Sequence, residues 1–129
     1  MILSASLEDY LEAIFELYKS KRAVRVRDVA KKLGVTMPSV NGALKNLEAR
    51  GLIEHEKYEY IELTESGNIH AAKVASKHSL IFTFLREVLG VDKQTAQTDA
   101  CKIEHVLSSG TVEKINEYID RSLSNAKEQ

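Results

Sequence analysis

The sequence has only one cysteine, one proline and six glycines among its 129 residues, and it has no tryptophan. A single cysteine, Cys101, excludes an internal disulfide framework and is typical of a reducing compartment. Turn residues are too few for a sandwich or barrel of many short strands. No apolar run approaches the roughly 20 residues that span a bilayer, and residues 1–6 do not form a basic and then apolar leader. We therefore expect a cytoplasmic, mostly helical protein with no membrane segment.

Positive charge is concentrated in one segment of the chain. Residues 21–50 contain eight basic and two acidic side chains, a net charge of +6, although the whole chain carries −1. The other 99 residues therefore carry −7. The positive segment would attract a phosphate backbone, and the negative remainder of the chain would repel it. A solvated charged surface would have the same composition, so charge alone leaves both interpretations open.

The pattern of the N-terminal half is typical of a winged helix-turn-helix. Apolar spacing and capping residues predict helices over residues 6–18, 28–33 and 38–50, with Ser6 as the first cap, Gly34 as a stop and Pro38 in a first turn. A short extended stretch is expected at 24–26. Two strands at 52–57 and 60–63, joined by a turn at 58–59, complete the order helix, turn, helix, hairpin.

The C-terminal half predicts three more helices, over about 64–89, 92–107 and 111–126. The glycines at positions 90 and 110 separate them. The fold class expected from the whole chain is therefore mainly α, with one small hairpin.

The third predicted helix is the candidate DNA-reading helix. Its apolar residues Val40, Leu44 and Leu47 form one inner face, so its opposite face is free to enter a major groove. An ordinary surface helix of a small bundle is the alternative. Small and hydrogen-bonding groups on the free face, the adjoining turn and two arginines of the basic segment are the candidate DNA contacts: Arg25, Arg27, Thr36, Met37, Pro38, Ser39, Asn41 and Lys45.

Two groups of side chains suggest a metal ion. Asp9, Glu12 and Glu16 share one face of the first helix, where like charges cost a few tenths of a kcal/mol per pair. A solvated surface tolerates this cost, but a cation between the carboxylates explains the stripe better. Cys101, Glu104 and His105 project from one side of a predicted helix, and each is a transition-metal ligand once deprotonated.

Cys101, Glu104 and His78 each have an ordinary alternative. A cysteine is most often a small core residue, and Glu104 fits an exposed acid. His78, on the preceding helix, fits either a half-buried linker residue or a further ligand. A catalytic Cys101/His105 pair is disfavoured because nothing in the sequence indicates an oxyanion site or a substrate pocket.

Several motifs in order resemble the diphtheria-toxin-repressor/manganese-transport-regulator family. They are Ser6–Ile14, Gly34–Val40, Thr64–Gly67, Lys77–His78 and Asp99–Leu107, which contains the family's Cys/Glu-x-x-Glu-His element. The resemblance implies a cytosolic homodimer that binds palindromic double-stranded operators. It also implies a winged helix-turn-helix DNA-binding domain over 1–64 and a helical metal-binding and dimerisation domain over 65–129, without a further SH3-like domain.

The resemblance implies six metal ligands: Asp9, Glu12, His78, Cys101, Glu104 and His105. The two N-terminal acids match the manganese-responsive type, whereas Cys101 matches the iron-responsive type. Phe82 and Gln97 stand where the iron type has a carboxylate and a histidine of its ancillary site. Carboxylates and imidazoles suit Mn²⁺ or Fe²⁺, and a thiolate favours softer ions. We expect Fe(II) or Mn(II) as corepressor, with Zn(II), Co(II) or Ni(II) able to bind in vitro.

The function expected is that of a metal-dependent transcriptional repressor of metal-ion homeostasis genes, activated for operator binding by Fe(II) or Mn(II). One alternative is a winged-helix regulator that responds to a small organic ligand and has no functional metal site. The other is a thiol- or metal-dependent enzyme, which leaves the basic segment unexplained. We therefore expect no enzymatic activity.

Overall fold

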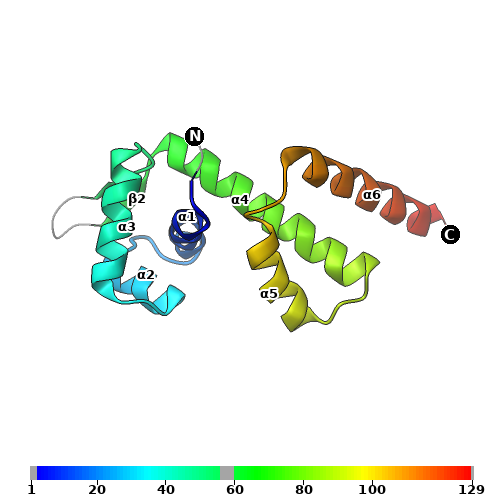
Figure 1. Ribbon diagram of the computed structural model, residues 1–129, viewed down its shortest axis with the longest axis horizontal. Helices are drawn as coiled ribbons and strands as arrows, with labels where there is room; N and C mark the ends of the chain where they lie inside the picture. Colours follow the sequence, from blue (N-terminus) through cyan, green and yellow to red (C-terminus); the bar gives the residue numbers. More distant parts are fainter. Residues whose placement is uncertain (1–2, 56–59, 129) are drawn as a thin grey trace. The chain divides into compact units, whose positions relative to one another are not determined.

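The computed structural model describes residues 3–55 and 60–128, and it is mainly helical with a small two-stranded hairpin (Figure 1). It divides into two compact units, residues 1–73 and 74–129. None of the described helices has the length and apolar character needed to cross a membrane. The fold class predicted from the sequence is confirmed. The elements are α1 (Ala5–Leu17), α2 (Val26–Leu33), α3 (Met37–Ala49), β1 (Ile53–His55), β2 (Ile61–Leu63), α4 (Glu65–Thr83), η1 (Phe84–Val88), α5 (Lys93–Ile103) and α6 (Ser109–Glu128).

Helix α1 is the central packing element of the first unit. Its apolar stripe, which includes Leu11 and Ile14, is fully buried and packs with α2 and α3. The cap lies two residues earlier than predicted, at Ser4 rather than Ser6, and the helix begins at Ala5. The Ser4 hydroxyl accepts a hydrogen bond from the backbone N–H of Leu7 at 3.2 Å.

Helices α2 and α3 form the helix-turn-helix pair. Gly34 ends α2 at φ +67°, a left-handed conformation that glycine adopts without strain. Thr36 caps α3 by accepting a hydrogen bond from the N–H of Ser39 at 3.3 Å, and Pro38 lies in the first turn as predicted. Helix α2 begins at Val26, two residues before the predicted start, because the Asp28 side chain caps it.

Within the described residues, the hairpin strands start one residue later than predicted, at Ile53 and Ile61, and predicted strand residues 56–57 lie outside the described residues. β1 and β2 pair antiparallel with His55 opposite Ile61, and Val24 makes an isolated bridge to Ile61. The predicted extended stretch at 24–26 is thus limited to Val24. The Tyr18 hydroxyl donates a hydrogen bond to the Ile61 carbonyl, and burial raises the pKa of Tyr18. The turn predicted at 58–59 lies outside the described residues.

The start of α4 packs very closely against the segment before β1. Thr64 donates its backbone N–H to the Leu52 carbonyl at 3.1 Å and its hydroxyl to the Gly51 carbonyl at 2.7 Å. A Cβ placed on Gly67 would lie 1.9 Å from the Leu52 oxygen. Only glycine permits this approach without a shift of the backbone.

The second unit contains the end of α4, the π-helical turn η1, α5 and α6. Both α5 and α6 pack on η1, and Phe84 meets Tyr118 edge to face. The predicted helix over 64–89 therefore ends in a wider turn, with an i→i+5 hydrogen bond from Leu89 to Phe84. The last helix starts at Ser109 rather than residue 111, because Ser108 caps it and Gly110 is helical.

The Asp28 carboxylate stabilises the start of α2. It accepts a hydrogen bond from the N–H of Arg25 at 2.9 Å and lies 3.4 Å from the Lys21 ammonium. The Arg25 N–H is the main reason that the pKa of Asp28 is lowered. We expect Asp28→Ala to reduce the free energy of unfolding by about 1 kcal/mol at pH 7, measured by urea denaturation.

The pH dependence of this loss follows from the lowered pKa. The stabilisation is complete above the unfolded pKa of about 4 and disappears as the pH falls through the lower folded value. The difference between wild type and Asp28→Ala should therefore be constant from pH 7 to 5 and shrink below about pH 4. Glu113→Ala, at an exposed position of α6, is the control. An Asp28→Ala protein as stable as wild type at pH 7 would contradict the capping role.

Gly67→Ala should reduce the free energy of unfolding by about 1–3 kcal/mol, the usual cost of forced overpacking. The added methyl group would collide with the Leu52 carbonyl. Gly42→Ala is the matched control, because nothing lies within 4 Å of its Cβ position in α3. Alanine is the better helix former, so Gly42→Ala should gain about 0.5–1 kcal/mol. Equal effects of the two substitutions, measured by urea denaturation, would show that the close approach is unimportant.

Candidate metal centre and DNA-reading surface

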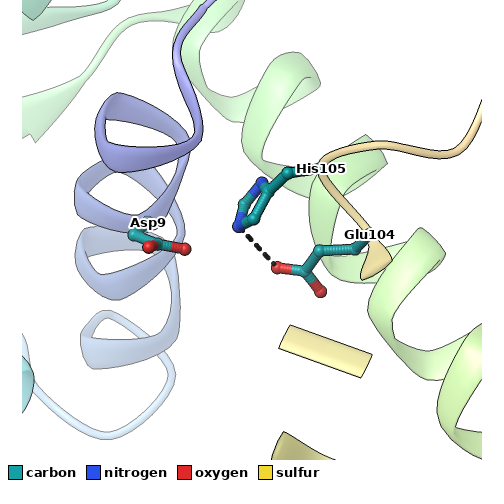
Figure 2. A group of neighbouring side chains, drawn as sticks. All are labelled: Asp9, Glu104 and His105. Atoms are coloured by element: carbon teal, nitrogen blue, oxygen red, sulfur yellow. Dashed lines mark ion pairs between the residues drawn. The ribbon is translucent and has the colours of Figure 1, made fainter. Parts of the chain in front are cut away.

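A cluster of donor atoms lies where α5 ends beside α4 in the second unit. The Nδ1 atom of His78, on α4, lies 2.8 Å from Oε2 of Glu104. The other carboxylate oxygen of Glu104, Oε1, lies 3.5 Å from the Nε2 atom of His105. Figure 2 shows this ion pair as a dashed line. The Cys101 sulfur lies 3.8 Å from the same His78 Nδ1. The structure therefore brings together four of the six predicted ligands.

Helix α5 ends earlier than predicted, beside this cluster. The sequence predicts a helix through residue 107, but α5 ends at Ile103, whose carbonyl accepts hydrogen bonds from the N–H groups of both Val106 and Leu107. A tightened last turn of this kind is common at helix ends. The prediction that the helix runs through residue 107 is therefore wrong. Glu104 is the C-terminal cap of α5 and its N–H still donates to the Ala100 carbonyl at 3.0 Å, so it keeps a helical position one turn after Cys101.

The Glu104 carboxylate has no exposed surface, and the His105 side chain is only 6% exposed. Removing an ionised carboxylate from water costs several kcal/mol unless partners compensate the charge. The two imidazoles are such partners, and each becomes a cation when protonated. A divalent cation would compensate the same carboxylate more strongly.

The donor set fits a transition-metal ion. It combines one carboxylate, two imidazoles and one thiol, all of which are ligands when deprotonated. Two ligand atoms bound to one ion at about 2.1–2.3 Å each lie roughly 3–4 Å apart. The separations of the Cys101 sulfur from His78 and of His105 from Glu104 fall in that range.

The other two predicted ligands lie on α1, in the first unit. Asp9 and Glu12 are one turn apart and share a helix face, as predicted; Figure 2 labels Asp9 on this helix. The third acid of the stripe, Glu16, makes an ion pair with Lys19 at 3.2 Å, so its charge is compensated locally. Beside them, Glu8 lies 3.2 Å from Nε2 of His70, on α4.

The DNA-reading surface is the outer face of α3 with the turn that precedes it. Val40, Leu44 and Leu47 are buried on the inner face, as predicted. Every predicted contact on α3 and its turn is exposed, and Met37 is 51% exposed. The exposed set comprises Thr36, Met37, Pro38, Ser39, Asn41 and Lys45 on α3 and its turn, with Arg25 and Arg27 at the start of α2.

Two contacts in this surface were not predicted from the sequence. The Thr36 hydroxyl caps α3 and also lies 2.9 Å from the Ser39 hydroxyl, so both groups already have partners. The Arg25 guanidinium donates to the Tyr60 hydroxyl at 3.1 Å and lies over its ring, 5.0 Å from the centroid. Tyr60 is 35 residues from Arg25, and no local pattern indicates such a pairing.

A helix-turn-helix with a hairpin and a helical unit with clustered metal-type donors define a metal-binding, DNA-binding regulator. Residues 2–61 match the N-terminal DNA-binding domain of iron-dependent repressors. Residues 64–125 match the metal-binding and dimerisation domain of the same repressors. The chain belongs to the iron-dependent repressor family, which confirms the resemblance described from its motifs.

Known proteins of this type are similar over most of the chain. A helix-turn-helix transcriptional regulator of Methanocaldococcus jannaschii is 38% identical over 120 residues, which is 92% of this chain and 96% of that protein. The regulator MntR of Lysinibacillus sphaericus is 33% identical over 114 residues, which is 88% of this chain and 81% of that protein.

Solved structures give the same result. A manganese-dependent repressor in complex with manganese has a TM-score of 0.82 at 26% identity, and ScaR with bound Zn²⁺ has 0.75 at 30%. The matches cover 88% of this chain but 52% and 53% of those chains, so it spans about half their length. The protein is a transcriptional regulator, and the prediction that it is not an enzyme is confirmed.

Proposed function

We propose that this protein is a homodimeric, cytoplasmic repressor that binds palindromic double-stranded operators when Fe(II) or Mn(II) is bound. The DNA-binding function belongs to residues 1–64, and metal binding and dimerisation belong to residues 65–129. The observation that carries the proposal is the fully buried Glu104 carboxylate held between His78 and His105, with the Cys101 sulfur nearby. Family membership and the exposed outer face of α3 support the DNA-binding part.

The ligands proposed for the ion are His78, Cys101, Glu104 and His105, together with Asp9 and Glu12 of α1. The distances within the second unit support the first four. The shared face of Asp9 and Glu12 supports the other two, because clustered carboxylates repel one another without a cation. A bound divalent ion supplies the positive charge that allows these carboxylates to converge.

The donor chemistry restricts the ion. Carboxylates and imidazoles favour Mn²⁺ or Fe²⁺ over softer ions, whereas one thiolate shifts the preference toward Fe²⁺, Co²⁺ or Zn²⁺. We therefore propose Fe(II), with Mn(II) as the second candidate. One similar repressor was solved in complex with manganese and another, ScaR, with bound Zn²⁺.

The coupling between metal and DNA follows from where the proposed ligands lie in the chain. Asp9 and Glu12 belong to α1, which packs against the helix-turn-helix pair α2 and α3. His78, Cys101, Glu104 and His105 belong to the unit that dimerises. When ligands from both units bind one ion, they fix the orientation of the two helix-turn-helix pairs in the dimer. Operator half-sites about 34 Å apart require such a fixed separation.

A regulator that responds to a small organic ligand is the alternative. This alternative accounts for the exposed α3 face equally well, but it does not explain why Glu104 is buried among two histidines and a cysteine. Metal analysis of the purified protein separates the two functions, because the alternative predicts no stoichiometric divalent ion.

Operator binding should depend on the ion. Duplexes are first selected from a random-sequence pool in the presence of Mn²⁺, and affinity is then measured by fluorescence anisotropy with and without Mn²⁺ at one salt concentration. A coupling of about 1–3 kcal/mol predicts binding about 5- to 150-fold tighter with Mn²⁺. Equal affinities would refute the switch.

Two variants serve as controls for this measurement. Lys45→Ala, on the outer face of α3, should weaken binding with and without Mn²⁺ by the same factor. Asp9→Asn should instead reduce the ratio between the two conditions. If Asp9→Asn keeps the full ratio, Asp9 is not a ligand.

Cys101→Glu should move the ion preference toward Mn²⁺, because a carboxylate oxygen replaces the softer sulfur. The measurement is competition between Mn²⁺ and Co²⁺ for the purified protein. Cys101→Ser, which removes the thiolate without adding a carboxylate, should weaken both ions. An unchanged ranking in Cys101→Glu would mean that Cys101 does not bind the ion.

A further inference from the structure

The imidazole ring of His78 is contacted on both nitrogens and on one face. Nδ1 lies 2.8 Å from Glu104, and Nε2 lies 3.2 Å from the side-chain oxygen, Oε1, of Gln97. The ring stacks on Phe82, with centroids 6.5 Å apart and planes 8° from parallel. These contacts all come from the second unit, and together they restrain both the position and the rotation of the ring.

Helix α5 provides contacts on both sides of the ring. Gln97 and Cys101 are four residues apart and therefore lie on one face of α5. Gln97 meets Nε2, whereas the Cys101 sulfur lies 3.8 Å from Nδ1. The carboxylate and the thiol thus share one side of the imidazole, and the amide occupies the other.

The two sides of the His78 ring differ in which of its nitrogens can bind a metal ion. A neutral ring has one N–H and one nitrogen with a free lone pair, and only the second can bind a metal ion. The nitrogen opposite the ion keeps its proton and donates it to an acceptor. The side-chain oxygen of Gln97 is an acceptor at hydrogen-bond distance from Nε2.

We propose that Gln97 is a positioning residue that keeps the His78 proton on Nε2 and so makes Nδ1 the nitrogen that binds the ion. The inference rests on the proposed function, since it requires that the Glu104 cluster holds a divalent ion. Without the Gln97 oxygen, the acceptor left to the ring is the Glu104 carboxylate beside Nδ1. An incoming ion would then compete with an N–H···O hydrogen bond for both groups.

The affinity test compares three variants of the full chain. Gln97→Met keeps the length of the side chain and cannot accept the Nε2–H, so it should weaken Mn²⁺ binding 10- to 100-fold. Gln97→Glu restores an acceptor and should recover most of the loss. Gln94→Met, one turn earlier on α5 and also exposed, is the matched control and should bind as wild type does.

The second readout is the protonation of the His78 ring in protein loaded with ¹¹³Cd²⁺, observed by ¹⁵N NMR after histidine labelling. Wild type should show ¹¹³Cd coupling to Nδ1 and a slowly exchanging proton on Nε2. Gln97→Met should exchange that proton faster. A merely structural role for Gln97 changes neither signal.

The outcomes separate the two proposals. Coupling to Nε2, or Gln97→Met binding as tightly as Gln94→Met, would overturn the role of Gln97 and leave the metal site intact. Wild type that binds neither Mn²⁺ nor Cd²⁺ would overturn the proposed function itself, and the inference with it. Loss of affinity in Gln97→Met without recovery in Gln97→Glu would show that shape, rather than an acceptor, matters at this position.

Discussion

The Glu104 carboxylate, which has no exposed surface, is the constraint on which the second unit depends. An ionised carboxylate away from water needs partners of compensating charge or hydrogen bonds, and His78 and His105 flank it on its two oxygens. Glu104 stands at the end of α5, where its N–H still donates to the Ala100 carbonyl, and His105 follows in the turn after the helix.

A site that binds a cation also compensates the charge of a buried carboxylate, and it does so more strongly than hydrogen bonds do. His78 lies on α4 and Cys101 on α5, Glu104 caps the end of α5 and His105 follows it, so the donors are positioned by two helices and a helix end. His78 is restrained on three sides, by Glu104, Gln97 and Phe82. Such support around a ligand is what fixes its orientation and its proton.

In the first unit, helix capping and close packing position α3, the candidate DNA-reading helix. Asp28 starts α2, Gly34 ends it, and Thr36 starts α3. The inner face of α3 is buried, so the outer face remains for DNA. The Gly67 contact with Leu52 fixes the start of α4 on this unit, and α4 then contributes its later residues to the second unit.

Much of this could be predicted from the sequence, because its signals are local. The amphipathic stripes of α1 and α3, the stop at Gly34 and the order of helices and hairpin follow from spacing and caps. The errors lie at element ends: Ser4 rather than Ser6 caps α1, α2 starts at Val26, and α5 stops at Ile103. Helix ends depend on side-chain hydrogen bonds and burial, for which apolar spacing carries little information.

By itself, the sequence determined the fold class, the basic segment and the residue types of the donor cluster, since these depend on composition and on spacing along one helix. It did not determine that Gln97 meets His78, that Arg25 meets Tyr60, or that Glu104 is fully buried. The tertiary structure decided those contacts. They join residues 19 to 35 positions apart, and which of many distant polar groups meet depends on how the helices pack, not on the local pattern.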